Sequence, residues 1–232
     1  MENRIIIDLK NVKFGYREKP ALLKDLNFVL RQGERVGMIG PNGCGKTTML
    51  YLIMGLIKPH DGSVEIFGRR RVQEHDFVDV RERIGFLFQN SDDQLFCPSV
   101  REEIAFGPLN FGKRGKEVED IISRSLARVG LDGFKNRIPY HLSGGEKRRL
   151  AMATILAMRP HVLLLDEPTL GLDLPTVQRI AEILEEPGLS YVVVSQNLDF
   201  LRRTTTQVYT FEDGAIVKFR LPRDRKHRSN SH

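Results

Sequence analysis

The sequence predicts an α/β protein with a parallel sheet, an N-terminal antiparallel β layer and a helical insertion. Three observations support this prediction. Strand-like apolar runs alternate with helix-like segments, the first forty residues alternate in hydrophobicity, and residues of about 98–158 are helical in character. The 232 residues, of which 41% are hydrophobic and 28% charged, are enough to build one globular domain with a substantial core.

The predicted elements follow one another along the chain. IIIDLKNVKFGY and LLKDLNFVL are expected to form the antiparallel layer, and RVGMIG is expected to form a strand after a turn. VLLLDEP is too short for a helix and suits a buried parallel strand. In chain order the later elements are a helix at 46–57, strands at 62–68 and 83–89, the helical segment, a strand at 162–168, a helix at about 174–186, a strand at 191–195 and a hairpin around Asp213–Gly214.

Composition excludes several classes of protein. The longest nearly uninterrupted apolar run, MLYLIMGLI, is about half as long as a membrane-spanning helix. The N-terminal residues MENRIIIDLK do not resemble a signal peptide. Two cysteines, Cys44 and Cys97, provide no disulfide framework, so a reducing cytosol is the expected setting.

The net charge of +6 is concentrated at the end of the chain. Residues 220–232 carry five Lys or Arg and one Asp, and therefore account for +4 of it. This basic tail is expected to be disordered, and it could be simply solvated or be a weak electrostatic contact for anionic lipid or RNA. The run RRR at 69–71 follows a glycine and is expected on an exposed loop.

A glycine-rich stretch between a predicted strand and a predicted helix matches the phosphate-binding pattern G-x-x-x-x-G-K-S/T. Its glycines let backbone N–H groups surround phosphate oxygens, while the helix N-terminus adds a positive dipole. The alternative, a glycine-rich turn before an ordinary helix, does not explain the Lys–Thr pair. Cys44 is interpreted as a tolerated small residue rather than a redox sensor. The predicted nucleotide-binding residues are Gly40, Asn42, Gly43, Cys44, Gly45, Lys46, Thr47 and Thr48.

An acidic pair, Asp166 and Glu167, follows the buried strand LLLD. In open α/β sheets ligands bind outside the carboxyl ends of the strands, so this pair should lie beside the phosphate loop. Asp166 can then contribute to a Mg²⁺ site, and Glu167 can act as a general base or orient the attacking water.

The segment LSGGE begins a strongly periodic helix and forms a second anion-binding helix start. One chain needs no second phosphate cradle unless it serves a nucleotide held by another chain, which predicts a two-fold dimer with shared sites. A capping box formed by Ser143 and Glu146 is an alternative that can coexist with this role. The residues predicted to act on the other chain are Ser143, Gly144, Gly145 and Glu146.

The ordered motifs GPNGCGKTT, LSGGE, LLLDEP and GLD resemble those of the ATP-binding-cassette (ABC) ATPases, up to about residue 219. The resemblance implies a P-loop NTPase (RecA-like) core with the β layer at 1–90 and 160–219, and a helical signature subdomain at about 91–159. It implies ATP and Mg²⁺ as ligands, with Tyr16 stacking on adenine and Asp173 at the dimer seam. Gln89 would join Thr47 and Asp166 at the metal.

The segment FLFQNSDDQLFCPSVREEIAFGPLN is similar to the ATPases of energy-coupling-factor importers for cobalt, nickel and biotin. The resemblance implies a dimer with itself or a paralogous ATPase, together with a transmembrane coupling subunit and a substrate-binding membrane subunit. It places the protein on the cytoplasmic face of the cell membrane. The residues implied at the partner interface are Asp92, Asp93, Leu95 and Phe96.

Two other functions remain open at this point. A soluble ABC ATPase could act on nucleic acid or ribosomes through the basic tail, although nucleic acid is the less expected partner because the chain has one cassette. A regulatory nucleotide-binding subunit with weak hydrolysis is the other.

Gln196 departs from the family pattern, because it stands where the resembling proteins carry a histidine. Its amide can donate to a γ-phosphate but cannot transfer a proton near neutral pH. We therefore expect Gln196 to act with Glu167 in the catalytic site, but without acid–base chemistry of its own.

Overall fold

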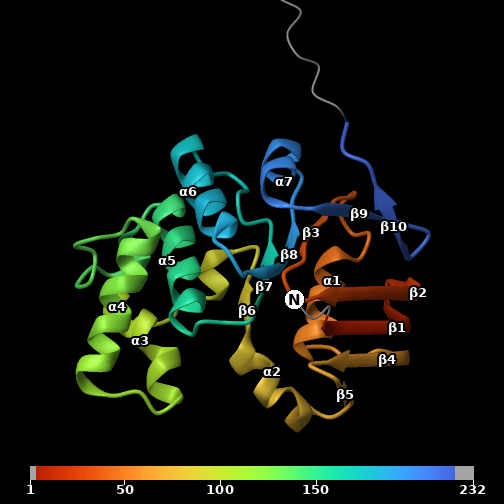
Figure 1. Ribbon diagram of the computed structural model, residues 1–232, viewed down its shortest axis with the longest axis horizontal. Coiled ribbons are helices and arrows are strands. Elements are labelled where there is room, and N and C mark those ends of the chain that lie inside the picture. The colour runs from red at the N-terminus through yellow and green to blue at the C-terminus, as the bar shows by residue number, and fades with distance from the viewer. Residues whose placement is uncertain (1–3, 223–232) are drawn as a thin grey trace, which may run out of the picture.

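Two β-sheets lie side by side in the computed structural model, which describes residues 4–222 (Figure 1). The antiparallel sheet has the order β2-β1-β4-β5 and the larger sheet the order β10-β9-β3-β8-β7-β6. The first comprises β1 (Ile5–Tyr16), β2 (Lys19–Arg31), β4 (Asp61–Ile66) and β5 (Arg69–Arg71). The second comprises β3 (Arg35–Met38), β6 (Ile84–Leu87), β7 (Val162–Asp166), β8 (Ser190–Val194), β9 (Gln207–Glu212) and β10 (Ala215–Phe219).

The centre of the larger sheet is parallel, as the short apolar runs predict. Every residue of β7 and β8 is buried, so both faces of these strands are covered by other elements. Met38 at the end of β3 and Asp166 at the end of β7 both pair with Val194. The carboxyl ends of the three strands therefore meet at one edge of the sheet, as the α/β fold prediction requires.

Helix α1 (Lys46–Met54) lies between the two sheets, and seven of its residues are buried. It is three residues shorter than the predicted helix at 46–57. Gly55 adopts a left-handed conformation with φ 66° and ends the helix. A Cβ atom at this position would lie 2.3 Å from the Phe77 ring, so the close packing also requires glycine.

The α-helices between β6 and β7 gather on one side of the larger sheet (Figure 1, left). Helices α3 (Val100–Asn110), α4 (Gly115–Val129) and α5 (Gly144–Ala157) pack on one another and share a hydrophobic core with residues of β7 and β8. The segments that complete the described fold are η1 (Glu74–Phe77), α2 (Val78–Arg83), η2 (Ser91–Asp93), η3 (Pro139–His141), α6 (Leu174–Glu185) and α7 (Leu198–Thr204).

The prediction of an exposed loop at 69–71 was wrong about the loop and about Arg71, whereas Arg69 and Arg70 are exposed as expected. Residues 69–71 form β5, and the Arg71 side chain is buried, with its guanidinium donating to the Asp79 carboxylate and to the Ile66 carbonyl at 2.9 Å. The local sequence does not show that Arg71 forms an ion pair with Asp79 of α2. The predicted tail lies outside the described residues from position 223 onward. Within residues 4–222, none of the helices has the length and apolar character that crossing a membrane would require.

Candidate active site

The site forms where the loops after β3, β7 and β8 meet. Backbone hydrogen bonds fasten these loops to one another: the Glu167 N–H donates to the Val194 carbonyl at 2.9 Å, and the Ser195 N–H donates to the Met38 carbonyl at 3.0 Å. Three segments that are far apart in the sequence are thereby held within one edge of the sheet. The parallel register, rather than any local motif, brings them together.

The phosphate loop wraps around the ammonium of Lys46. The Lys46 side chain is 7% exposed, and its Nζ donates to the carbonyls of Gly40 at 2.7 Å and Pro41 at 2.9 Å. Gly45 has φ 113°, and a Cβ atom there would lie 2.7 Å from Leu23 Cδ2. Glycine at this position is therefore required both by the backbone and by the packing of β2.

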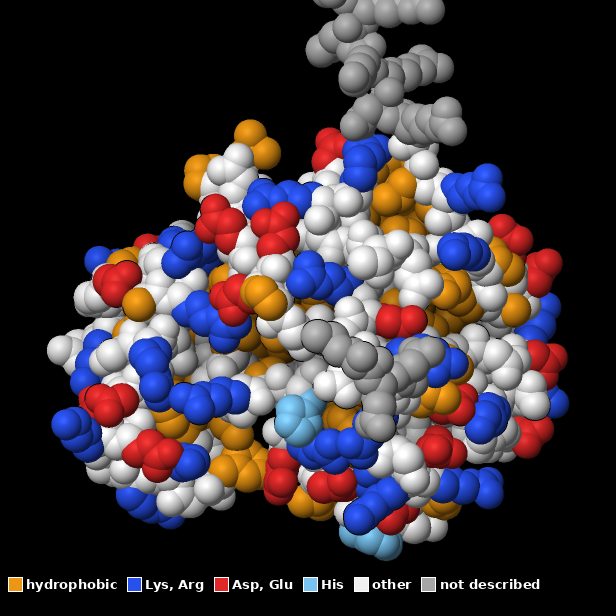
Figure 2. Space-filling model, in the orientation of Figure 1, with side chains coloured by type: hydrophobic (Ala, Val, Ile, Leu, Met, Phe, Trp, Pro, Cys, Tyr) orange, Lys and Arg blue, Asp and Glu red, His pale blue; other side chains and the backbone are white. Residues whose placement is uncertain are grey.

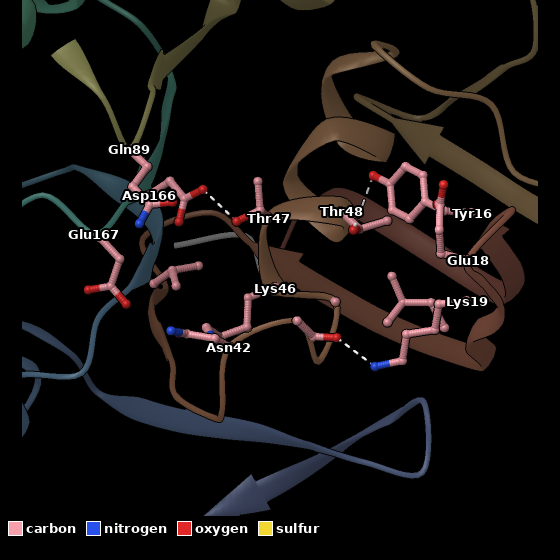
Figure 3. A pocket seen from close by; sticks show the side chains of 14 residues that line it. Tyr16, Glu18, Lys19, Asn42, Lys46, Thr47, Thr48, Gln89, Asp166 and Glu167 are labelled. Carbon is pink, nitrogen blue, oxygen red and sulfur yellow. Dashed lines mark hydrogen bonds between the residues drawn. The ribbon is translucent and has the colours of Figure 1, made fainter. Parts of the chain in front are cut away.

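A pocket of about 460 Å³ opens beside this loop (Figure 3). It brings together ten of the residues predicted from sequence, and these come from the β1–β2 hairpin, the phosphate loop, the end of β6 and the end of β7. They are Tyr16, Asn42, Gly43, Gly45, Lys46, Thr47, Thr48, Gln89, Asp166 and Glu167. A cavity of this volume is in the usual range for small-molecule sites.

Oxygen donors gather on one wall of the pocket. The Thr47 hydroxyl donates to Asp166 Oδ2 at 2.6 Å, and the Gln89 side chain lies on the same side (Figure 3). Asp166 is only 2% exposed, and this burial raises its pKa, although the Thr47 hydroxyl and the charges of Lys46 and Arg148 act in the opposite direction. Hydroxyl, amide and carboxylate oxygens are ligands that suit a hard divalent cation.

Glu167 has an unusual backbone conformation for a residue with a side chain. Its φ of 46° is in the left-handed region, and the residue is 8% exposed. The Gln196 N–H donates to Glu167 Oε2 at 3.3 Å. Burial raises the pKa of the Glu167 carboxyl, with Asp166 adding to the effect. A buried carboxylate with a raised pKa is a stronger base than an exposed one, which suits the activation of a water molecule.

Gln196 touches the phosphate loop through its side chain. Its Nε2 donates to the Gly40 carbonyl at 2.5 Å, so this carbonyl accepts from both Gln196 and Lys46. The neighbouring Asn197 has a structural role, because its Oδ1 accepts from the Phe200 N–H and caps α7. The two adjacent amides therefore differ in what they contact: one reaches the loop and the other starts a helix.

Four residues that line the pocket were not predicted: Glu18, Lys19, Leu22 and Val194. Lys19 is the most informative of them, since its Nζ donates to the Gly43 carbonyl at 2.8 Å. The hydroxyl of Tyr16, on the same hairpin, lies 3.4 Å from the hydroxyl of Thr48 in α1, and the two share a hydrogen bond (Figure 3). In the sequence, the feature that could have identified Lys19 as a pocket residue is its position three residues after Tyr16, at the tip of the β1–β2 hairpin.

The signature residues Ser143–Glu146 and Asp173 do not line this pocket. Ser143 and Glu146 form the capping box at the start of α5, with the Ser143 N–H donating to Glu146 Oε2 at 2.8 Å. Asp173 caps α6 by accepting from the Thr176 N–H at 3.1 Å. Both helix starts therefore lie outside this pocket.

The comparisons with known proteins agree on the family. The family model described as ABC transporter matches residues 23–170, more than half of the chain. The energy-coupling factor transporter ATP-binding protein EcfA of Methanothermobacter thermautotrophicus is 41% identical, with 91% of this chain and 70% of the relative covered. The protein of the same name from Methanocaldococcus jannaschii is 40% identical, with 94% and 80% covered.

Solved structures of ABC ATPases share the fold. CbiO1 of Clostridium perfringens, part of the ABC transporter complex cbiONQ, superposes with a TM-score of 0.82 at 30% identity, covering 93% of this chain and 88% of that chain. A dimeric ATP-binding cassette bound to ADP and Pi superposes with a TM-score of 0.84 at 32% identity, covering 94% and 99%. The phosphate loop, the acidic strand end and these matches together show that the chain belongs to the ABC transporter family as an ATPase subunit.

Proposed function

We propose that this chain hydrolyses ATP to power an energy-coupling-factor importer, and that the importer carries cobalt, nickel or a vitamin such as biotin. The observation that carries the proposal is a short segment that runs from the ATP pocket to an apolar groove. Gln89 lines the pocket, and Phe96, seven residues later, lines the groove. Relatives named as energy-coupling-factor ATPases support the importer type, and the similarity to CbiO1, a part of the ABC transporter complex cbiONQ, agrees with a role in transport.

The groove has a volume of about 340 Å³ and walls that are mostly apolar. Phe96 is 67% exposed, and it meets Phe106 of α3 edge-on with ring centroids 4.9 Å apart. Exposed aromatic side chains grouped beside a groove are typical anchors for a partner helix. We infer that a helix of the transmembrane coupling subunit binds here.

The segment between pocket and groove is held firmly. The Gln94 amide donates to the Ala151 carbonyl and the Thr154 hydroxyl of α5, both at 3.1 Å, and accepts from the Phe88 N–H. The Glu103 carboxylate accepts from the Phe96 and Cys97 N–H groups at 2.9 and 2.6 Å. A rigid segment of this kind can transmit a displacement at Gln89 to the partner.

The four residues expected at the interface have different surroundings. Phe96 lines the groove, whereas Leu95 is half-buried against the core of the helical part. Asp92 is exposed and forms an ion pair with Lys147 at 2.7 Å, and Asp93 is exposed. We propose Phe96 and Phe106 as the anchors, with Asp92 and Asp93 at the rim and Leu95 as their support.

We infer that the active unit is a dimer of this chain with itself or with a paralogous ATPase. Ser143–Glu146 of each chain would then contact the nucleotide of the other, with Asp173 at the seam. Tyr16 would stack on adenine, and the Lys46 ammonium would contact the phosphates. In this arrangement residues 1–219 form a single domain, and residues 91–159 are its signature subdomain. The domain would lie on the cytoplasmic face of the membrane.

Nucleic acid is the less favoured partner. On the face shown in Figure 2, Lys and Arg side chains are interspersed with Asp and Glu among the described residues, so this face offers no uniformly basic surface for phosphates.

Magnesium fits the oxygen donors of the pocket. Thr47, Gln89 and Asp166 would hold it together with phosphate oxygens. When bound, Mg²⁺ neutralises charge on the phosphates. Glu167 would orient and deprotonate the attacking water, and Gln196 would donate a hydrogen bond to the γ-phosphate after releasing the Gly40 carbonyl.

Affinity isolation of the tagged chain from native membranes tests the partner. We expect an integral membrane protein to co-purify with the wild type and with Val72→Asp, which alters an exposed apolar residue outside the groove. Phe96→Asp should lose this protein because a carboxylate cannot be buried against an apolar helix without a large desolvation cost. Isolation of ribosomes or nucleic acid in its place would contradict the proposal. Uptake of cobalt, nickel or biotin by the isolated complex in liposomes would then identify the solute.

Replacing Gln196 by His tests the altered strand end. We expect the wild-type pH profile to show an acid limb above the ordinary glutamate pKa, because burial raises the pKa of Glu167 and only its ionised form can accept a proton. The wild-type profile should show no limb from the titration of a histidine imidazole at position 196. Gln196→His should raise kcat by up to about 10-fold and add a limb near pH 6–7. Gln178→His, on the exposed surface of α6, is the control. An unchanged rate and profile for Gln196→His would disprove the idea.

A further inference from the structure

We propose that Arg148 is a positioning residue, which locks the backbone of Glu167 and the end of β6 to helix α5. The proposal rests on the proposed ATPase function and assigns a role to a residue whose own side chain lines neither the nucleotide pocket nor the groove. Arg148 is 4% exposed and lies in α5, the helix that begins with the signature motif. One side chain would thus join the catalytic carboxylate of this chain to the motif that serves the other chain.

Within residues 4–222, the hydrogen bonds of the Arg148 guanidinium all go to main-chain carbonyls. At the end of β7 it donates to Asp166 at 2.7 Å, to Glu167 at 2.6 Å and to Pro168 at 3.2 Å. After β6 it donates to Phe88 and, at 3.1 Å, to Gln89. Such a set needs the planar fork of a guanidinium, because the single ammonium of a lysine cannot reach both strand ends at once.

The backbone of Glu167 needs this support. Its left-handed φ of 46° is a conformation that residues with side chains rarely adopt, and it persists only when neighbours hold it on both sides. The Glu167 N–H is held by the Val194 carbonyl, and the Glu167 carbonyl is held by Arg148 Nη2. Since these two bonds set the direction of the side chain, Arg148 fixes where the carboxylate points.

The Arg148 side chain is also a buried charge. Burial lowers the pKa of Arg148 to about 10, so the guanidinium stays charged at neutral pH. Arg148→Lys therefore removes the planar fork but leaves a cationic side chain, whereas Arg148→Met removes both the fork and the charge.

Arg148→Met and Arg148→Lys separate geometry from charge. We expect both variants to lower kcat about 10- to 100-fold, because a misplaced catalytic group costs this much, while KM for ATP changes less than about 3-fold since the pocket lining is intact. Because Arg148→Lys keeps a cationic side chain, a loss of kcat in that variant reflects the missing fork. The Lys variant thus distinguishes a positioning role from a purely electrostatic one.

Arg149→Met is the matched control. Arg149 is the next residue of the same helix and also binds main-chain carbonyls, with its Nη1 donating to Gly130 at 2.8 Å at the end of α4, away from the pocket. We expect its kcat to stay within about 3-fold of the wild type. Nucleotide binding and thermal unfolding are measured for every variant to confirm that it folds.

Equal losses of kcat in the Arg148 and Arg149 variants would overturn the proposal, as would a raised KM with unchanged kcat. If Arg148→Met does not fold, Arg148→Lys decides the question, since full activity in that variant excludes a need for the fork. A wild-type chain that neither binds nor hydrolyses ATP would instead contradict the proposed function.

Discussion

Glu167→Gln is expected to lower ATP turnover at least 100-fold while ATP binding is retained. The amide keeps the shape of the side chain and can still accept the Gln196 N–H, but it cannot take a proton from water. Steady-state phosphate release and a nucleotide-binding titration measure the two quantities. Glu212→Gln, an exposed carboxylate at the end of β9, is the control and should retain wild-type turnover.

The same variant should accumulate as an ATP-bound dimer. If hydrolysis releases the clamp between the phosphate loop of one chain and Ser143–Glu146 of the other, a chain that cannot hydrolyse ATP should stay closed. Gel filtration with ATP should then show twice the mass seen without nucleotide. A monomer with unimpaired turnover would contradict both the catalytic role of Glu167 and the shared site.

Lys46→Ala should weaken ATP binding by about 100-fold or more. The ammonium donates to the Gly40 and Pro41 carbonyls, and it is the positive charge at the centre of the phosphate loop. Hydrogen bonds to charged groups contribute about 1.5–3 kcal/mol each, so losing the contacts of one ammonium to phosphates accounts for a change of this size. Isothermal titration of the purified chain with ATP measures it.

Lys19→Ala provides the comparison for Lys46→Ala. Lys19 also lines the pocket and donates to a loop carbonyl, that of Gly43, but it is exposed at the hairpin tip. Its removal should weaken ATP binding only several-fold, because exposed charges are screened by water and salt. If both variants lost the same affinity for ATP, or if Lys46→Ala kept the wild-type affinity, the assignment of Lys46 to phosphate binding would be wrong.

Much of the fold could be predicted because its signals are local. The apolar runs at 162–165 and 191–194 have no polar face and are too short for a buried helix. They are therefore expected to form central strands of a parallel sheet, as they do. The phosphate loop is equally local, since its glycines and the Lys–Thr pair are contiguous. The length of α1 was not predicted, because the helix ends where Phe77 packs against Gly55, a contact between residues far apart in the sequence.

The chain by itself determined the α/β fold, the ABC family and the candidate nucleotide residues, since each depends on contiguous residues or on their order. Only the tertiary structure decided that Arg148 points inward among three consecutive basic residues, that Glu167 is left-handed, and that Lys19 reaches the phosphate loop. The orientation of a side chain in these cases depends on strand register and helix packing, which connect segments distant in sequence. That long-range geometry is what places the carboxylate of Glu167, and no local pattern encodes it.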